Sequence, residues 1–249
     1  VPRVGGRPSM STGLSQRPQV IAVDVDGTLY DGTTIHPDAV AALATARAEG
    51  DTILIVSGRP WRDLPIVALA SAAVCEDGAV LVDIASGERR RFAEPPPQAV
   101  VDELERRGAT GVVAGEVAIG LPAVFVEIAR AVVAEHPGTL RIEHNKDSVA
   151  IAPIGCNKGT GLERALEHLG APDALVLAIG DASNDLPMFR AADVAMAVAN
   201  ADRAVVDAGI ERSSLPCGAG VAEIVRAHLA RRERQRAVTD ADPLATRTS

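Results

Sequence analysis

The stretch Val20-Ile21-Ala22-Val23-Asp24-Val25-Asp26-Gly27-Thr28-Leu29 decides the fold of this 249-residue chain. Its first four residues are apolar and mostly β-branched, which predicts a strand buried on both faces, as in a parallel sheet. Two carboxylates follow at the carboxyl end of this strand, the edge at which open α/β sheets bind their ligands. Asp24 and Asp26 are two positions apart, so in an extended chain their side chains point the same way.

The acidic turn after this strand favours a cation and an anion bound together. Two close carboxylates repel each other unless a cation or a shared proton relieves them. Gly27 allows a backbone N–H to approach an anion closely. A Mg²⁺ ion with a bound phosphate would satisfy both features. The alternative is a plain acidic turn, in which Asp-Gly is common.

Three later stretches favour the ligand site over the plain turn: Val56-Ser57-Gly58-Arg59, Asn157-Lys158-Gly159 and Gly180-Asp181-Ala182-Ser183-Asn184-Asp185. Together with the first stretch they resemble, in order and spacing, the four motifs of haloacid dehalogenase-superfamily phosphatases. The resemblance extends from about Gln19 to about Leu229. Its first and fourth motifs are specific, whereas the Ser and Lys motifs gain weight from their positions.

The hydrophobic pattern around the motifs predicts an α/β fold with a Rossmann-like parallel-sheet core. Strands are predicted at 20–23, 52–56 and 73–75, with helices at 37–49 and 60–71 between them, an order that implies right-handed crossovers. After residue 79 the order becomes hairpin, helix, strand, helix and hairpin, which predicts an inserted α+β domain. The first rhythm resumes with helices at 158–169 and 184–191, strands at 174–179 and 194–198, and a last helix at 219–236.

These elements divide the chain into four expected regions. They are a disordered N-terminal tail at 1–17, a core at 18–79 and 153–236, an α+β cap at 80–152 and a disordered C-terminal tail at 237–249. A cap between the second and third motifs resembles the Cof-type and sucrose-phosphate-phosphatase-like branch, and also archaeal phosphoglycolate phosphatases. The segment Glu76-Asp77-Gly78-Ala79 resembles the Glu-Asn-Gly-Ala segment that precedes such caps, with Asp77 in place of the usual Asn.

Composition excludes several classes of function. The net charge of −8 and the pI near 5.2 argue against sequence-independent nucleic-acid binding, which needs a basic surface, but allow a small anionic substrate. Three cysteines are too few for a disulfide framework and predict a reducing, cytoplasmic location. No apolar run approaches the roughly 18 residues that a membrane span needs, so no membrane partner is expected.

The resemblance implies a role for each motif residue. Asp24 would be the nucleophile that forms an aspartyl phosphate, and Asp26 the general acid/base. Ser57 and Lys158 would complete the catalytic set. Mg²⁺ would be held by Asp24, the backbone carbonyl of Asp26, Asp181 and Asp185. The phosphate-binding set would be Gly27, Thr28, Ser57, Gly58, Lys158 and Asn184.

Each assignment has a structural alternative. Asp181 and Asn184 precede a helix and are also suited to capping it, and the two roles are compatible. Ser57 could cap the helix that follows Pro60, and a lone lysine at the start of a helix is usually solvated. Arg59 could contact substrate or form a surface salt bridge.

The predicted strand at 140–144 carries the candidate specificity residues. Its alternation places Leu140, Ile142 and His144 on one face and Arg141, Glu143 and Asn145 on the other. The polar face would look toward the catalytic strand ends, as it does in the caps this one resembles. Arg141 and Glu143 could then contact the non-phosphate part of the substrate. Alternatively, they could form an ion pair with each other and with neighbours such as Arg89 or Arg91.

The predicted function is a Mg²⁺-dependent phosphatase that acts on a small phosphorylated metabolite, either a sugar phosphate or a phosphoglycolate-like molecule. Two alternatives stay open: a sugar phosphomutase, and a receiver-like module that is phosphorylated on Asp24 and signals. Such modules lack an acid/base at the position of Asp26 and lack a cap of this size, so Asp26 favours turnover.

Overall fold

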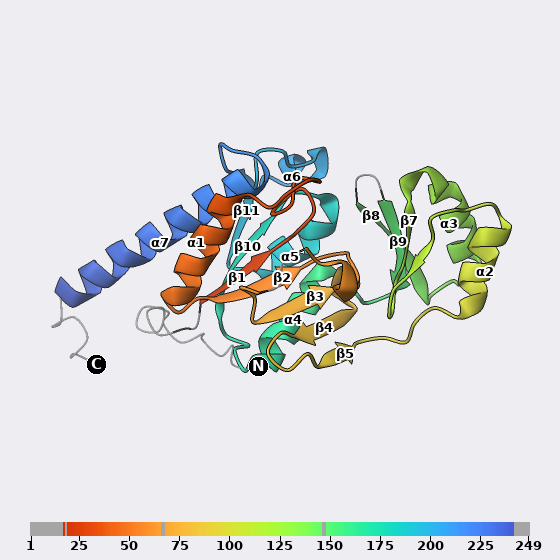
Figure 1. Ribbon diagram of the computed structural model, residues 1–249, viewed down its shortest axis with the longest axis horizontal. Coiled ribbons are helices and arrows are strands. Elements are labelled where there is room, and N and C mark those ends of the chain that lie inside the picture. Colours follow the sequence, from red (N-terminus) through yellow and green to blue (C-terminus); the bar gives the residue numbers. More distant parts are fainter. Residues whose placement is uncertain (1–16, 18, 66–67, 146–147, 242–249) are drawn as a thin grey trace, which may run out of the picture.

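The computed structural model describes residues 17, 19–65, 68–145 and 148–241, which form a larger and a smaller lobe (Figure 1). The larger lobe is built on an eight-stranded sheet in the order β12-β11-β10-β1-β2-β3-β4-β5. Its strands are β1 (Gln19–Val23), β2 (Thr52–Val56), β3 (Ala72–Cys75), β4 (Val80–Asp83), β5 (Arg89–Arg91), β10 (Leu175–Gly180), β11 (Val194–Ala197) and β12 (Glu211–Arg212).

The sheet brings the motif residues to one edge. Strand β1 lies between β10 and β2, parallel to both, with Val20 opposite Val176 and Thr52. The chain reaches β2 on one side of β1 and β10 on the other, so this is the point where strand order reverses. Open α/β sheets bind ligands at the carboxyl ends of the strands at such a point.

Helices cover both faces of the sheet, because its buried strands alternate apolar side chains between two cores. One core packs Ile21 and Ile53 against α1 (Pro37–Ala48) and α7 (Cys217–Ala241). The other packs Ala22 and Leu54 against α4 (Lys158–His168) and α5 (Leu186–Ala191). A short helix, α6 (Arg203–Asp207), lies between β11 and β12 in the chain. The predicted α/β, Rossmann-like core is confirmed.

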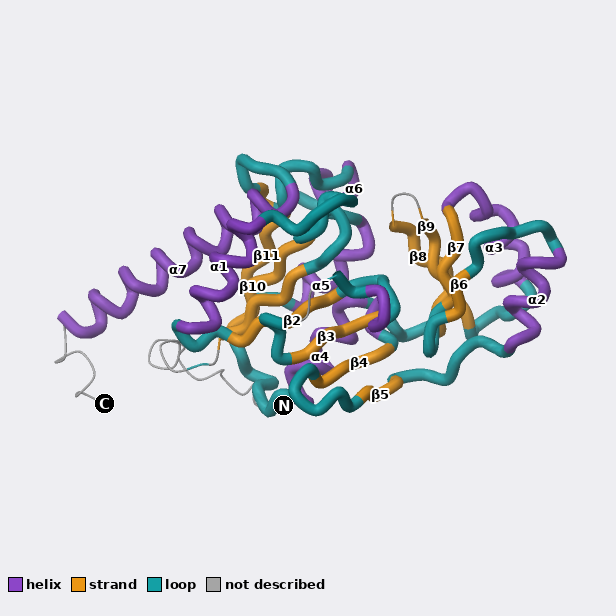
Figure 2. The backbone as a smooth tube through the Cα atoms, viewed as in Figure 1, coloured by secondary structure: helices purple, strands orange, loops and turns teal. Residues whose placement is uncertain are grey.

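The smaller lobe is a four-stranded antiparallel sheet with two helices on one face. Its strands, in the order β6-β7-β9-β8, are β6 (Val113–Ala114), β7 (Ile119–Pro122), β9 (Ser148–Pro153) and β8 (Leu140–Asn145). Helices α2 (Gln98–Arg106) and α3 (Val126–Ala134) share a buried core with this sheet, and they lie on the side away from the larger lobe (Figure 1). Residues 92–97 and 154–157 connect the lobes (Figure 2).

The first hairpin after β3 belongs to the larger sheet, whereas the sequence analysis placed residues 80–92 in the insert. Strand β4 pairs antiparallel with β3, with Val74 opposite Leu81, and β5 pairs with β4. Val80, Leu81 and Val82 are all buried. A continuous apolar run of this kind suits a strand inside a covered sheet better than one in a small cap.

Other element boundaries also differ from those expected. Among the described residues of the helix expected over 60–71, only the 3₁₀ turn η1 (Trp61–Asp63) is helical, because Pro60 and Pro65 bracket it and Pro65 cannot donate a helical hydrogen bond. The strand expected over 111–119 is split into β6 and β7.

The two expected tails fall largely outside the described residues, but their inner ends are ordered. Helix α7 extends to Ala241, so the prediction of disorder is wrong for residues 237–241. Arg17 donates hydrogen bonds to the carbonyl oxygens of Asp173 and Ala174. Within the described ranges no helix has the length and apolar character to cross a bilayer.

A buried carboxylate joins the two lobes. Glu76 begins the 3₁₀ turn η2 (Glu76–Gly78) in a left-handed conformation with φ 53° and is 2% exposed. Its two carboxylate oxygens accept the backbone N–H groups of Glu116, Val117 and Ala118 at 2.7–2.8 Å. A Cβ on Gly115 would lie 2.5 Å from this carboxylate, so only glycine permits the approach. Glu76 therefore anchors the smaller lobe.

Glu76→Gln is expected to lower the free energy of unfolding by about 1–3 kcal/mol, because the charge-assisted bonds are lost and an amide N–H₂ faces backbone donors. Urea denaturation would measure this. Glu88→Gln, at an exposed position in the β4–β5 hairpin, is the matched control and should change stability little. An equal effect in both variants would show that the three-bond contact contributes nothing.

Candidate active site

A buried lysine joins the motifs at the carboxyl edge of the larger sheet. Lys158, the first residue of α4, is 1% exposed. Its Nζ donates to Asp24 Oδ1 and to Asp185 Oδ1, both at 2.6 Å. Asn157 caps α4 by accepting the N–H groups of Gly159 and Thr160, which fixes the backbone that carries the lysine. The solvated alternative for Lys158 is therefore wrong.

The acidic groups around Lys158 form a buried cluster with excess negative charge. Oxygens of Asp24, Asp181 and Asp185 lie within 4.8 Å of one another, and all three residues are buried. Burial raises the pKa of Asp24 well above its usual range, Asp185 and Asp181 raise it further, and Lys158 opposes them. Burial alone would lower the pKa of Lys158, but the neighbouring carboxylates raise it above its ordinary value.

This donor set fits a divalent cation. When all three carboxylates are ionised, the one ammonium leaves two uncompensated negative charges among buried groups, which is costly unless a cation balances them. Carboxylate oxygens are the ligands that Mg²⁺ prefers. Asp26 was also expected to contribute, through its backbone carbonyl, and this stays a prediction. Its carboxylate is not a member of the cluster.

Hydrogen bonds hold the carboxylates of the fourth motif in place. Asp185 Oδ2 accepts the backbone N–H groups of Asp181 and Ala182 at 2.8 and 3.0 Å. Thr28 Oγ1 donates to Asp181 Oδ1 at 3.1 Å, and Asn200 Nδ2 lies 3.4 Å from Asp181 Oδ2. Asn200 also donates to the Gly27 carbonyl at 2.8 Å and so ties the first motif to the chain after β11.

Asp26 has a different partner from Asp24, because the chain turns after β1 instead of continuing extended. Its two carboxylate oxygens accept Nε and Nη2 of Arg59 at 2.8 and 2.6 Å, a bidentate pair. Arg59 also lies over the Tyr30 ring, 5.2 Å from its centroid, and donates to the Asp63 carbonyl. Arg59 therefore positions the candidate acid/base, in a half-buried ion pair.

The predicted phosphate-binding groups differ in their availability. The N–H of Gly27 donates to Tyr30 O and that of Thr28 to Val25 O, so neither is free for an anion, contrary to the expectation for this turn. Gly27 has φ 81°, which explains why glycine stands there. Ser57 is fully buried after β2, and its Oγ accepts the Arg59 N–H at 3.1 Å, which leaves the hydroxyl proton able to donate.

Asn184 and Asp77 form a contact that the sequence did not indicate. Asn184, in the 3₁₀ turn η4 (Ser183–Asp185), donates from Nδ2 to Asp77 Oδ1 at 3.1 Å. Asp77 is 3% exposed, and burial raises its pKa while Lys158 and Asn184 oppose the shift. Asp77 lies close to Gly58: a Cβ added at this glycine would be 3.1 Å from Asp77 Oδ2.

Strand β8 of the smaller lobe faces this edge, and its residues lie against η4. Leu140 and Ile142 pack into the core of the smaller lobe, as expected from their alternation. Arg141 forms an ion pair with Glu143 and donates from Nε to the Cys156 carbonyl at 2.8 Å. Arg89, one of the two candidate ion-pair neighbours, pairs with Glu116 instead.

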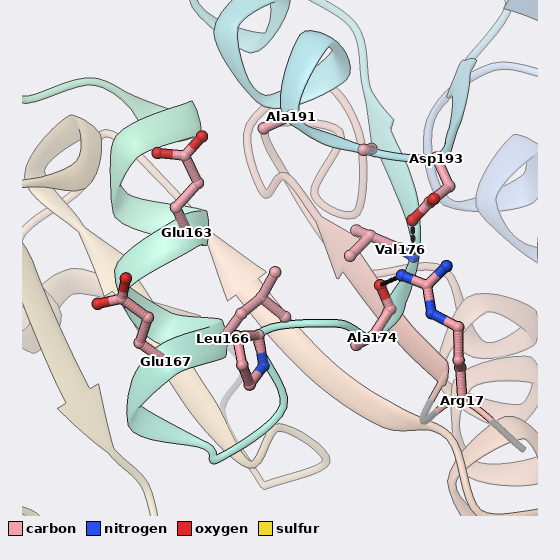
Figure 3. A pocket seen from close by; sticks show the side chains of 10 residues that line it. Arg17, Glu163, Leu166, Glu167, Ala174, Val176, Ala191 and Asp193 are labelled. Carbon is pink, nitrogen blue, oxygen red and sulfur yellow. Dashed lines mark hydrogen bonds between the residues drawn. The ribbon is translucent and has the colours of Figure 1, made fainter. Parts of the chain in front are cut away.

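A cavity of about 440 Å³ lies at the opposite edge of the sheet (Figure 3). It is lined by Arg17, Glu163, Leu166, Glu167, Ala174 and Asp193, among others. Arg17 donates to the Ala174 carbonyl, and Asp193 accepts the Val176 N–H at 2.9 Å, so both charged side chains are already hydrogen-bonded to backbone groups. Because Ala174 precedes β10 and Asp181 follows it, this cavity is remote from the acidic cluster.

Neither the contacts of Asn200 with the first and fourth motifs nor the anchoring role of Glu76 was predicted from the sequence. A signal existed for Asn200, because it follows β11 at the same carboxyl edge as Asp181. Glu76 had no such signal, since its partners are backbone N–H groups 40–42 positions away in the chain.

Two known proteins are similar to this chain over most of its length. The phosphoglycolate phosphatase of Methanothermobacter thermautotrophicus is 29% identical over 218 residues, which cover 84% of this chain and 97% of the relative. That of Saccharolobus solfataricus (phosphoglycolate phosphatase 1) is 29% identical over 219 residues, 83% of this chain and 94% of the relative.

Solved structures show the same fold. A Thermoplasma acidophilum protein superposes with a TM-score of 0.70 at 22% identity, covering 85% of this chain and 98% of that one. A structure described as a sugar phosphatase of HAD subclass IIB gives a TM-score of 0.71 at 18% identity, with 84% and 98% covered. The family described as haloacid dehalogenase-like hydrolase matches residues 21–104 and 125–223. The resemblance of the four motifs is thereby confirmed, and the chain belongs to the haloacid dehalogenase-like hydrolase family.

Proposed function

We propose that this hydrolase is a Mg²⁺-dependent phosphatase that acts on a small phosphorylated metabolite through an aspartyl-phosphate intermediate on Asp24. One observation carries the proposal: Asp24, Asp181 and Asp185 form one buried carboxylate cluster, and the buried Lys158 binds Asp24 and Asp185 within it. Phosphoryl transfer needs little covalent chemistry from the protein beyond a nucleophile, since most of the catalysis is positioning and charge neutralisation. The cluster supplies a nucleophile, a cation and a fitting metal site at one place.

The first half-reaction joins the phosphorus to Asp24. A carboxylate oxygen of Asp24 attacks the phosphorus and the ester oxygen leaves. Asp26, protonated and with one oxygen released from the Arg59 fork, gives the leaving oxygen its proton. In the second half-reaction Asp26 takes a proton from the attacking water, and Asp24 and inorganic phosphate are released. Lys158 and the Ser57 hydroxyl would hold phosphoryl oxygens. A bound Mg²⁺ would be ligated by Asp24, Asp181 and Asp185 and would neutralise charge on the transferring group.

The relatives support a small substrate. Two of the proteins compared above are named phosphoglycolate phosphatases and a third is described as a sugar phosphatase, so a phosphoglycolate-like molecule and a sugar phosphate are the two candidate classes. A sugar phosphomutase and a phospho-acceptor signalling module are the alternatives. The Asp26–Arg59 pair beside the cluster favours turnover over a stable phosphoprotein. A cytoplasmic location stays a prediction from the sparse cysteines.

Hydrolysis of p-nitrophenyl phosphate with and without Mg²⁺ tests the proposed function. Continuous release of inorganic phosphate in the presence of Mg²⁺ is the expected result. Accumulation of one phosphate per chain without turnover would support the signalling module, and transfer between sugar positions without net release would support the mutase.

Asp181→Ala is expected to raise the Mg²⁺ concentration at half-maximal activity at least tenfold, because the metal loses a buried ligand oxygen. EDTA is expected to abolish wild-type activity, and added Mg²⁺ to restore it. Asp207→Ala, at an exposed position on α6, is the control for general loss of negative charge. Full activity in EDTA would contradict the metal assignment.

A further inference from the structure

Asp77 is a buried carboxylate beside the proposed nucleophile site that the mechanism does not use. It lies between the Ser57–Gly58 turn, whose Ser57 carbonyl accepts its N–H at 3.2 Å, and Asn184 of η4. Lys158 is near enough to influence its charge, as are Arg141 and Glu143 on β8. Asp77 therefore lies between the phosphate-binding residues Ser57 and Asn184 and within electrostatic range of strand β8. The non-phosphate part of a substrate whose phosphate is held at Asp24 and Ser57 would occupy the space between these residues and the smaller lobe.

The cations nearest Asp77 already have partners. Lys158 donates to the carboxylates of Asp24 and Asp185, so its charge is more than balanced within the acidic cluster. The Arg141 guanidinium binds the Glu143 carboxylate through Nη1 and the Cys156 carbonyl through Nε and Nη2. The Arg59 guanidinium donates from Nε and Nη2 to the two carboxylate oxygens of Asp26.

The described charges of this space therefore do not favour a second anion. Asp77 and Glu143 contribute two negative charges and Arg141 one positive charge, which leaves a net charge of −1. A substrate carboxylate would be repelled by the Asp77 and Glu143 oxygens. A substrate hydroxyl can instead donate to them.

Building on the proposed phosphatase function, we propose that Asp77, together with Glu143, is a specificity-determining residue that selects phosphate esters with hydroxyl groups at the other end over esters that end in a carboxylate. A polyol or sugar phosphate is then the substrate class, and a phosphoglycolate-like molecule is disfavoured. Like charges a few ångströms apart repel by at least an amount on the order of the 1.4 kcal/mol that corresponds to a tenfold change.

Two achiral probes test this directly. 2-Hydroxyethyl phosphate and 2-phosphoglycolate differ only in a hydroxymethyl group against a carboxylate. The assays are run at pH 8, because burial raises the pKa of Asp77 and a higher pH favours its ionised form. The wild-type kcat/KM for the hydroxyl probe is expected to exceed that for the carboxylate probe at least tenfold.

Substitutions at Asp77 and Glu143 test whether these residues cause the preference for the hydroxyl probe. Asp77→Asn removes the charge, retains an oxygen that can accept from Asn184, and suits the left-handed backbone at φ 50° and ψ 43°. Relative to the wild type, it is expected to lower the ratio of kcat/KM for 2-hydroxyethyl phosphate to kcat/KM for 2-phosphoglycolate about tenfold. Glu143→Gln, which removes the carboxylate partner of Arg141, should shift the ratio in the same direction. Asp207→Asn on α6 is the control and should leave the ratio unchanged.

The outcomes separate this proposal from the proposed function. If wild-type protein hydrolyses p-nitrophenyl phosphate but prefers 2-phosphoglycolate to the hydroxyl probe, the specificity proposal is overturned and the phosphatase function stands. An unchanged ratio in both folded variants also overturns it. If Asp77→Asn does not fold, Glu143→Gln alone decides. A wild-type protein that hydrolyses none of the three esters overturns both proposals.

Discussion

Asp24→Asn is expected to lower phosphate release from p-nitrophenyl phosphate by a factor on the order of 10⁴ or more, because an amide oxygen cannot act as the nucleophile. The side chain keeps its size, and its oxygen can still accept from Lys158 Nζ. Removal of one desolvated charge leaves Lys158 paired with Asp185, so the fold should be retained. Steady-state kinetics with a sensitive phosphate assay would measure the loss.

The controls for Asp24→Asn exclude trivial causes. Thermal unfolding should show a cooperative transition close to that of the wild type. After reaction with substrate, the wild-type protein stopped in acid should carry phosphate on Asp24, whereas the variant should carry none. Turnover within tenfold of the wild type would reject Asp24 as the nucleophile.

Asp26→Asn is expected to lower kcat by roughly 10²–10⁴-fold, the usual contribution of a general acid/base. The loss should be larger for an alkyl ester such as 2-hydroxyethyl phosphate than for p-nitrophenyl phosphate, since nitrophenolate leaves readily without a proton. This dependence on the leaving group distinguishes proton transfer from damage to the fold. The variant also loses the carboxylate that holds the Arg59 fork.

Asp38→Asn, at an exposed position on α1, is the matched control for Asp26→Asn and should keep full activity. Equal losses on the alkyl and nitrophenyl esters would point to a general disturbance of the site. Unchanged activity on both esters would remove Asp26 from the mechanism.

Much of the site could be predicted from sequence because its residues follow buried strands directly. Once β1, β2 and β10 are parallel neighbours, Asp24, Ser57 and Asp181 must meet at one edge, whatever the details of packing. The apolar periodicity that predicts these strands is local, so it can be read from the chain.

The remaining features depend on contacts between distant segments. The apolar run of β4 would suit either sheet, and only its pairing with β3 places it in the larger one. The side chain of Asp26 is directed by Arg59, 33 positions later, and not by the extended geometry assumed for its own segment. In the sequence Glu76 is one acidic residue in a turn after a predicted strand. Its anchoring role arises only when residues 116–118 fold back onto it.

The two ion pairs of the site differ in how they should respond to ionic strength. The side chains of Lys158 and Asp24 are 1% and 4% exposed, whereas those of Arg59 and Asp26 are 32% and 31% exposed. Dissolved ions screen charges that reach solvent far more than charges that are buried. Added salt should therefore weaken the ion pair that orients Asp26 and leave the ion pair between Lys158 and Asp24 nearly unchanged. The rate of proton transfer through Asp26 should then depend on ionic strength more than the reactivity of Asp24 does.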